Sequence, residues 1–401
     1  MSTPQAKLTK PELKLVLLLA AINCVQITDA LLMAPLAKSL QKELNMSLER
    51  YSFTAAIYGF AAAVCGLLSS AFIDRFDRRF VILLAFCGLI VSSVCSAFAI
   101  DFTTLLIARL AAGMTGGLTT CATLAVLGDV IPEERRGSAL GLLQAAFAVA
   151  AVVGLPVCIL LSDLSKTYAS AFAAVAVVGV LVLVWSIRKL PRIKPETVAG
   201  GRNALRDVSR VFAVPNHLRA FLFMLLVSLG SFVVINFMPQ YLQLNCGVSK
   251  DQFAIIFISM GLCSLAAAMV SGKLTDRLGA KPVFVGAMIL LMVAVGVVTN
   301  LPVVPVWVAG AVACVFMAMA VARLVPTHSI MLSAATPACR GAYTTVYNSV
   351  SHLGTSVGPL IAGQIIGKEG DKLVNYPTAG FVAIGCSLAG IVLAFFVKPA
   401  R

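Results

Sequence analysis

Charged residues and histidines are scarce in this sequence. Only 12% of its 401 residues are Asp, Glu, Lys or Arg, whereas about a quarter is usual in soluble globular proteins. The chain has 3 histidines and a mean hydropathy of +0.96. This composition excludes a soluble globular fold.

Patterns that carry common catalytic and metal-binding chemistry are also missing. The sequence has no P-loop to hold nucleotide phosphates, so we do not expect ATP as an energy source. Its 11 cysteines show no metal-ligand spacing, so we expect no metal site and no cofactor. No H-E-x-x-H pattern or other cluster of His, Asp and Glu occurs in the apolar stretches, which argues against an enzyme.

Long apolar runs dominate the sequence instead. Twelve runs of about 20 residues can each cross about 30 Å of hydrocarbon as a helix. They predict an all-α membrane protein with twelve transmembrane helices. The formal charge of +14 comes mostly from loops on one side of this topology, so the positive-inside rule places these loops and both termini in the cytoplasm. We therefore expect a lipid bilayer, and no nucleic acid, as the partner of this basic chain.

The two halves of the chain resemble each other. We expect a six-helix bundle over residues 1–187, a cytoplasmic linker over 188–218 and a second six-helix bundle over 219–401. The loop after the second span contains Asp74, Arg75, Arg78 and Arg79, and the loop after the eighth contains Asp276, Arg277 and Lys281. Duplicated bundles of this kind are typical of transporters whose site lies between the repeats.

These loop motifs resemble those of the major facilitator superfamily, and within it the twelve-helix drug:proton antiporter group. Arg109 and Gly113 match the R-x-x-x-G signature of the fourth span, and Asp29 with Pro35 resembles the pattern of the first span. The resemblance covers nearly the whole chain. It implies two pseudo-symmetric bundles, alternating access and proton-coupled efflux of small amphipathic or organic solutes, including drug-like compounds.

Asp29 is the one acidic residue that the apolar pattern places deep in the membrane. An ionised carboxylate there costs roughly 2.5 to 3.5 kcal/mol, so it persists only when paired, protonated or facing a wet cavity. Counting residues from the outer surface places Asp29 and Arg109 in one layer of the membrane. We predict a pair that couples transport to protons, and a static ion pair that fixes helix packing is the alternative.

Several other polar residues are candidates for the substrate cavity. Asn23 and Gln26 share the helical face of Asp29, and packing alone is the alternative role for both. Arg323 either binds an anionic solute or extends to the inner membrane interface. Asn348 and His352, on the eleventh span, complete the set, with packing as the alternative for His352.

The cytoplasmic loop motifs predict a conformational latch. Positive-inside charge alone would explain the basic residues, but not Asp74 and Asp276, which the resemblance places near a helix N-terminus of the opposite half. Small residues and prolines in the spans predict close helix packing and bends, whether moving or static. These packing and hinge positions are Gly113, Gly117, Gly154, Pro156, Gly354, Gly358 and Pro359.

The sequence thus predicts a secondary transporter of a small-molecule substrate, driven by the proton gradient. We expect a monomer in a bacterial inner membrane. An organic anion or a lipid-like metabolite bound by Arg323 is the alternative substrate class. A non-transporting membrane sensor or an enzyme is a remote alternative.

Overall fold

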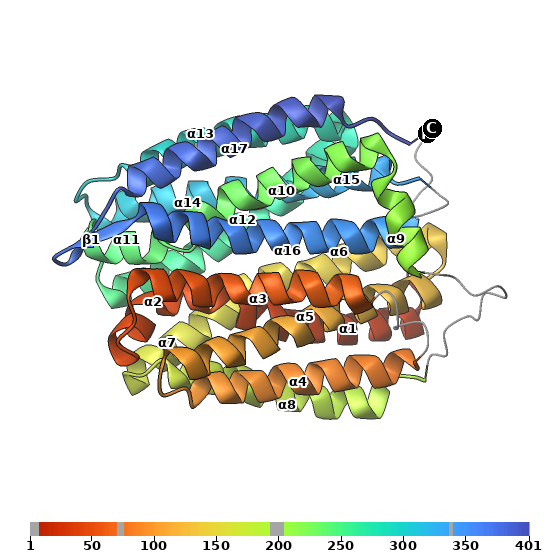
Figure 1. Cartoon of the computed structure of the whole chain (residues 1–401), viewed down its shortest axis with the longest axis horizontal. Coiled ribbons are helices and arrows are strands. Elements are labelled where there is room, and N and C mark those ends of the chain that lie inside the picture. Colours follow the sequence, from red (N-terminus) through yellow and green to blue (C-terminus); the bar gives the residue numbers. More distant parts are fainter. Residues whose placement is uncertain (1–7, 70–75, 193–203, 337–339, 401) are drawn as a thin grey trace.

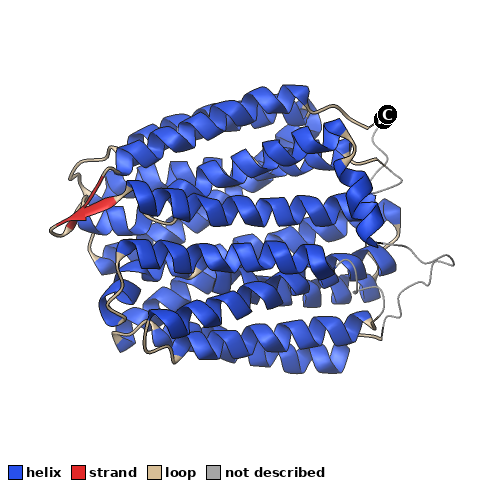
Figure 2. Cartoon of the chain, in the orientation of Figure 1, coloured by secondary structure: helices blue, strands red, loops and turns tan. Residues whose placement is uncertain are grey.

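The computed structural model describes residues 8–69, 76–192, 204–336 and 340–400. Almost all of this part of the chain is helical, and the one β-hairpin lies at one end of the molecule (Figure 2). The helices run roughly side by side. Figure 1 shows the N-terminal helices in one half of the molecule and the C-terminal helices in the other.

The helices of the N-terminal half fill the expected spans one to six. They are α1 (Lys10–Leu31), α2 (Met33–Glu43), α3 (Leu48–Ser69), α4 (Arg78–Ala97), α5 (Phe102–Val130), α6 (Glu133–Val149), the π-helix η2 (Ala150–Gly154), α7 (Leu155–Ser165) and α8 (Ala169–Lys189). A short helix, α9 (Ala204–Phe212), follows in the linker and packs on α10 and α16.

The C-terminal half contains the remaining helices and the hairpin. These are α10 (Pro215–Ile235), α11 (Met238–Leu244), α12 (Lys250–Leu278), α13 (Ala280–Thr299), α14 (Val306–Ala322), α15 (Leu324–Ala334), α16 (Arg340–Ile365), β1 (Gly367–Glu369), β2 (Lys372–Val374) and α17 (Tyr376–Phe396). The two strands pair antiparallel.

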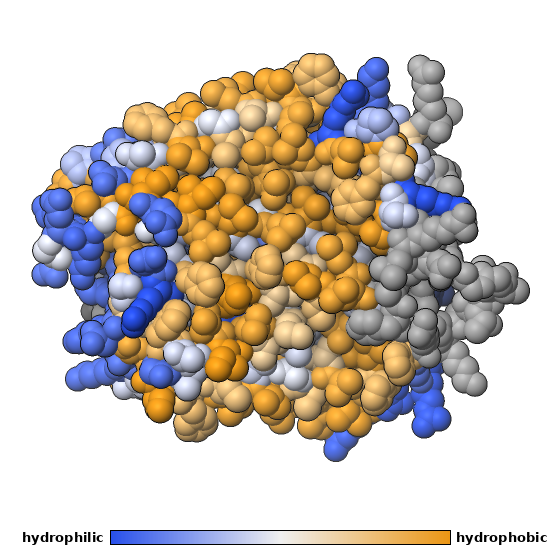
Figure 3. Space-filling model, viewed as in Figure 1, coloured by the Kyte–Doolittle hydropathy of each residue, from blue (hydrophilic) through white to orange (hydrophobic). Residues whose placement is uncertain are grey.

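The prediction of an all-helical membrane protein is confirmed. Eleven helices or continuous helix runs of the described chain are long and apolar enough to cross a bilayer. The more polar α16, with 26 residues, is long enough to be the twelfth. The face drawn in Figure 3 is apolar across its middle, and polar residues gather at its left end, as expected of a protein embedded in a bilayer.

Three of the spans break at the same distance from a proline. Helices α1 and α2 meet at Leu32, three residues before Pro35, and α14 and α15 meet at Arg323, three residues before Pro326. The gap between α10 and α11 begins at Asn236, three residues before Pro239. Proline lacks the backbone N–H and its ring crowds the preceding turn, so it interrupts the helix there.

Candidate functional site

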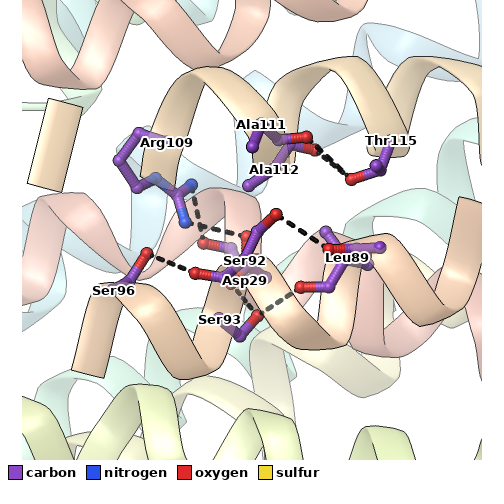
Figure 4. Close-up of polar contacts among 10 residues, drawn as sticks. Asp29, Leu89, Ser92, Ser93, Ser96, Arg109, Ala111, Ala112 and Thr115 are labelled. Carbon is purple, nitrogen blue, oxygen red and sulfur yellow. Dashed lines mark hydrogen bonds and ion pairs between the residues drawn. The ribbon is translucent and has the colours of Figure 1, made fainter. Parts of the chain in front are cut away.

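A buried ion pair joins the first and fourth spans of the N-terminal half. Nη1 of Arg109, on α5, lies 2.8 Å from Oδ2 of Asp29, on α1, and both side chains are 0% exposed. Nη2 of the same arginine donates to the backbone carbonyl of Asp29 at 3.2 Å. Figure 4 shows this pair. Sequence counting had placed the two charges in one layer, and the structure brings them into contact.

Three further side chains surround the pair. The hydroxyl of Ser93, on α4, donates to Oδ1 of Asp29 at 2.7 Å (Figure 4). The Arg109 guanidinium lies 4.8 Å from the ring centre of Tyr58 and 5.6 Å from that of Phe172, within the range of cation–π attraction. Asp29 is thus held by one cation and one hydroxyl, and the aromatic rings keep water away from the arginine.

Sequence reasoning did not identify these three residues. Ser93 does carry a signal, because Ser92, Ser93 and Ser96 lie together in an otherwise apolar span. Such serines commonly bond the backbone of their own helix, however, as the hydroxyls of Ser92 and Ser96 do here (Figure 4). Only the packing of α4 against α1 makes Ser93 a partner of Asp29.

The two polar residues before Asp29 differ in their surroundings. Gln26 is buried, and its amide nitrogen donates to the Gly116 carbonyl and to the Thr120 hydroxyl of α5 at 2.9 Å and 2.8 Å. Its amide oxygen has no hydrogen-bond partner in the described part of the chain. Asn23 is half-buried.

A π-helical turn connects the ion pair with the other half of the protein. Any side chain at Gly154, which ends η2, would meet the hydroxyl of Thr28, the neighbour of Asp29, at 2.5 Å. Before Gly154, η2 packs on α12 of the C-terminal half, where a Cβ at Gly261 would lie 3.0 Å from the Ala151 carbonyl oxygen. Pro156 follows in the first turn of α7. Such insertions are frequent at functional sites.

The predicted small-residue positions lie at close helix contacts. A Cβ at Gly113 or Gly117, on α5, would clash with the carbonyl oxygens of Tyr58 and Ala62 on α3. On α16, a Cβ at Gly354 or Gly358 would collide with α10. Pro359 lies inside α16. These four glycines therefore let helices approach within each half.

The C-terminal candidates lie on different helices. Arg323 is 3% exposed, and its Nη2 donates to the hydroxyl of Ser231, on α10, at 2.5 Å. Its side chain thus reaches the C-terminal part of α10 and does not extend to the inner interface. On α16, His352 and Asn348 are both half-buried. Near His352, α16 packs on α3, because a Cβ at Gly59 would lie 2.9 Å from the His352 carbonyl oxygen.

The loop residues of the predicted latch contact their own halves. Arg78 pairs with Asp129 at 2.9 Å, and Arg79 donates to the Ile187 carbonyl at 2.6 Å. Lys281 donates to the Val397 carbonyl at 3.0 Å. Asp276 and Arg277 are exposed, whereas Asp74 and Arg75 lie outside the described residues.

The two halves touch each other at their predicted outer ends. The side-chain amides of Gln41, on α2, and Gln240, on α11, exchange two hydrogen bonds of 3.3 Å. Nearby, the rings of Tyr51 and Phe237 meet edge to face at 5.9 Å. The two halves are therefore in direct contact at the end of the molecule that carries α2, α11 and the hairpin (Figure 1).

The fold and the site define a multi-pass membrane transporter built from two helical bundles. The chain belongs to the Major Facilitator Superfamily, whose family profile matches residues 18–227 and 220–401. This confirms the superfamily resemblance and the prediction that the chain is a transporter rather than an enzyme.

Several characterised and uncharacterised transporters are similar to the chain. It is 24% identical to a probable sugar efflux transporter from Mannheimia succiniciproducens, over 93% of this chain and 90% of that protein. It is 26% identical to the purine ribonucleoside efflux pump NepI from Escherichia coli, over 70% of this chain and 68% of that one. An uncharacterized MFS-type transporter, YceJ from Bacillus subtilis, is 22% identical over 84% of this chain and 85% of that protein.

One solved structure shows the same fold. It is a bacterial homologue of the human lysosomal transporter Spinster in an inward-facing, unoccupied conformation. The two chains superpose with a TM-score of 0.66 at 16% identity, over 98% of this chain and 95% of the other.

Proposed function

We propose that the protein exports small organic solutes by alternating access, driven by protons that Asp29 carries. The observation behind this proposal is the fully buried pair of Asp29 and Arg109. A carboxylate at this depth is costly unless it is paired or protonated. It therefore gives up its charge pairing with the arginine, but not the contact of the arginine with its backbone carbonyl, when it takes up a proton.

The surroundings of Asp29 support a coupling role. Its helix packs on η2, and η2 packs on α12 of the opposite half, so a movement between the halves reaches the pair through direct packing. The same shift that opens the outer end between Gln41 and Gln240 would change the contact of α1 with α5. Protonation of Asp29 and opening of the outer end are linked if the protonated pair is more stable in one conformation and the ionised pair in the other.

The efflux direction rests on the relatives. Two of them are named as efflux proteins, one for purine ribonucleosides and one for sugars. We extend the direction to this chain and expect small organic or amphipathic solutes as its substrates. These relatives come from bacteria. We therefore expect the protein to act as a monomer in a bacterial inner membrane, with both termini in the cytoplasm.

The cytoplasmic latch remains part of the proposal. In the conformation described here, Arg78, Arg79 and Lys281 bind groups of their own half, and the two halves touch at the outer end. We expect Asp74 to hold the cytoplasmic side shut in the opposite conformation. Labelling of cysteines introduced on the cytoplasmic face of Asp74→Asn protein tests this role, and labelling unchanged from the parent would contradict it.

The main experiment is transport in sealed liposomes. Purified protein is first screened for stabilisation by purine ribonucleosides, sugars and amphipathic dyes, and the compounds that stabilise it are then tested for flux under an imposed pH gradient. We expect a trapped pH dye to report proton movement opposite to the solute. Solute flux that ignores the pH gradient would refute proton coupling, and binding without any flux would favour the sensor.

A further inference from the structure

Arg323 is a buried cation with an incomplete set of partners. Its Nη2 bonds Ser231, but Nε and Nη1, both buried, have no hydrogen-bond acceptor in the described part of the chain. The side chain is 3% exposed. A guanidinium carries five N–H donors in a fixed plane, so most of its capacity is unused here.

The membrane core of the C-terminal half has no carboxylate to neutralise this charge. The sequence contains no Asp or Glu between Asp207 and Asp251, or between Asp276 and Glu369. These two stretches include α10, α11 and α13–α16. The acid of α12 that faces the cytoplasm, Asp276, is exposed at the helix end. The positive charge on Arg323 is therefore uncompensated within its own half.

The N-terminal half shows what is missing. There, an arginine of the fourth span meets the first span at a carboxylate, Asp29. In the C-terminal half, an arginine of the fourth span, formed by α14 and α15, meets the first span, formed by α10 and α11, at a hydroxyl, Ser231. The corresponding spans meet in both halves, but the buried arginine bonds a carboxylate in one and a hydroxyl in the other.

We propose that an anionic group of the transported solute, a carboxylate or a phosphate monoester, binds to Arg323 and Ser231. This proposal rests on the transport function above and names its substrate class. Arginine matches such oxyanions because its N–H groups bind two oxygens at once. Ser228 precedes Ser231 by one turn of α10, and its hydroxyl lies 3.4 Å from the Ser351 hydroxyl of α16. Two further hydroxyls therefore lie one turn from the proposed anion site.

The helix break at Arg323 fits this role. Pro326 separates α14 from α15 at this residue, which gives the span a joint next to the cation. Because the side chain is buried in the present conformation, the solute reaches it only when α10 and α15 move apart. Anion binding and the change of conformation are then parts of one step.

The test compares compounds that share a ring and differ in charge. Thermal unfolding of delipidated protein in a nonionic detergent is followed with benzoate, phenyl phosphate, benzyl alcohol or benzylamine at constant ionic strength. We expect benzoate or phenyl phosphate to raise the unfolding midpoint by several degrees, and the other two to leave it unchanged. Equal responses to all four, or no response to either anion, would overturn the proposal.

Two variants and one control test whether the anions bind at Arg323. Arg323→Gln removes the cation, and Ser231→Asp supplies the carboxylate internally, with Ser231→Asn as the neutral control of the same shape. Both Arg323→Gln and Ser231→Asp should lose the response to anions, and Ser231→Asp should unfold at a higher temperature than Ser231→Asn. Retention of the anion response in Arg323→Gln, or a Ser231→Asp midpoint no higher than that of Ser231→Asn, would disprove the assignment.

Two further measurements distinguish a soluble anion from a lipid head group, and the anion site from proton coupling at Asp29. Stabilisation by dihexanoyl phosphatidate alone would show that the site binds a lipid head group and would overturn the soluble substrate. Asp29→Asn protein should keep the anion response, since the two sites lie in different halves. If proton coupling fails in liposomes while benzoate still stabilises the protein through Arg323, the transport mechanism is wrong and the anion site stands.

Discussion

Arg109 binds Asp29 at two points, the carboxylate at 2.8 Å and the backbone carbonyl at 3.2 Å. The second contact holds the arginine on α1 even when the carboxylate is neutral. Protonation of Asp29 would therefore weaken the connection between α1 and α5 without releasing it. The first prediction tests this connection.

Removing one charge of the pair should have different effects on stability and transport. Asp29→Asn leaves Arg109 buried without its counter-charge, which should lower the free energy of unfolding by about 3 to 5 kcal/mol. The double variant Asp29→Asn with Arg109→Gln should recover much of this loss. Neither variant should move solute in response to a pH gradient, because neither has a group that binds the proton. Proton-driven flux in the double variant would favour the static ion pair.

Asp101 offers a matched control for Asp29. It precedes α5 at the outer end, and hydrogen bonds from the side chain and backbone of Thr104 hold its pKa below the usual range. It therefore stays ionised through neutral pH, and its stabilising effect is lost only as the pH falls through that lowered pKa. Asp101→Asn, with an amide that also caps helices, should leave the pH dependence of transport unchanged. A changed profile would show that the response to Asp29→Asn is not specific.

Ser93→Ala should weaken the buried pair. The Ser93 hydroxyl donates to Oδ1 of Asp29 at 2.7 Å. Without this donor, one oxygen of the buried carboxylate loses its hydrogen bond, so the free energy of unfolding should fall by about 1.5 to 3 kcal/mol and proton-driven flux in liposomes should decrease. Ser92→Ala is the control, because that hydroxyl bonds the Gly88 carbonyl of its own helix. Equal losses in the two variants would exclude a specific role for Ser93.

Glycine substitutions should separate tight helix contacts from open positions. In Gly113→Ala, the new methyl group clashes with the backbone of Tyr58 on α3, and overpacking of this kind costs about 1 to 3 kcal/mol. Gly296→Ala, on α13, adds its methyl group where no atom lies within 4 Å, so thermal unfolding in detergent should be unchanged or slightly raised. Similar losses in both variants would contradict the packing role of Gly113.

Joining the outer ends of the two halves should stop transport. Gln41 and Gln240 approach each other across the halves, so cysteines at both positions should react with a short cleavable cross-linker. We expect the cross-linked protein to lose solute flux in liposomes and to regain it after cleavage. Each single-cysteine variant is the control for the reagent, and full flux through the cross-linked protein would show that this contact need not open.

The sequence by itself determined the membrane-spanning helices of this protein. Length and apolarity specify a membrane helix without reference to its neighbours, because lipid forces each span to satisfy its own backbone hydrogen bonds. For the same reason, the twelve spans could be counted from the sequence alone. The cost of burying a charge also singled out Asp29, Arg109 and Arg323 before any contact was known.

Only the tertiary structure decided which groups meet. Ser93 binds Asp29 because α4 packs on α1, and Arg323 reaches Ser231 because α15 packs on α10; neither pairing follows from a pattern within one helix. Counting residues from the membrane surface placed Arg109 at the same depth as Asp29, but many other side chains also lie at that depth. Contact between spans depends on how helices rotate and pack against one another, and this depends on the whole bundle rather than on any one segment.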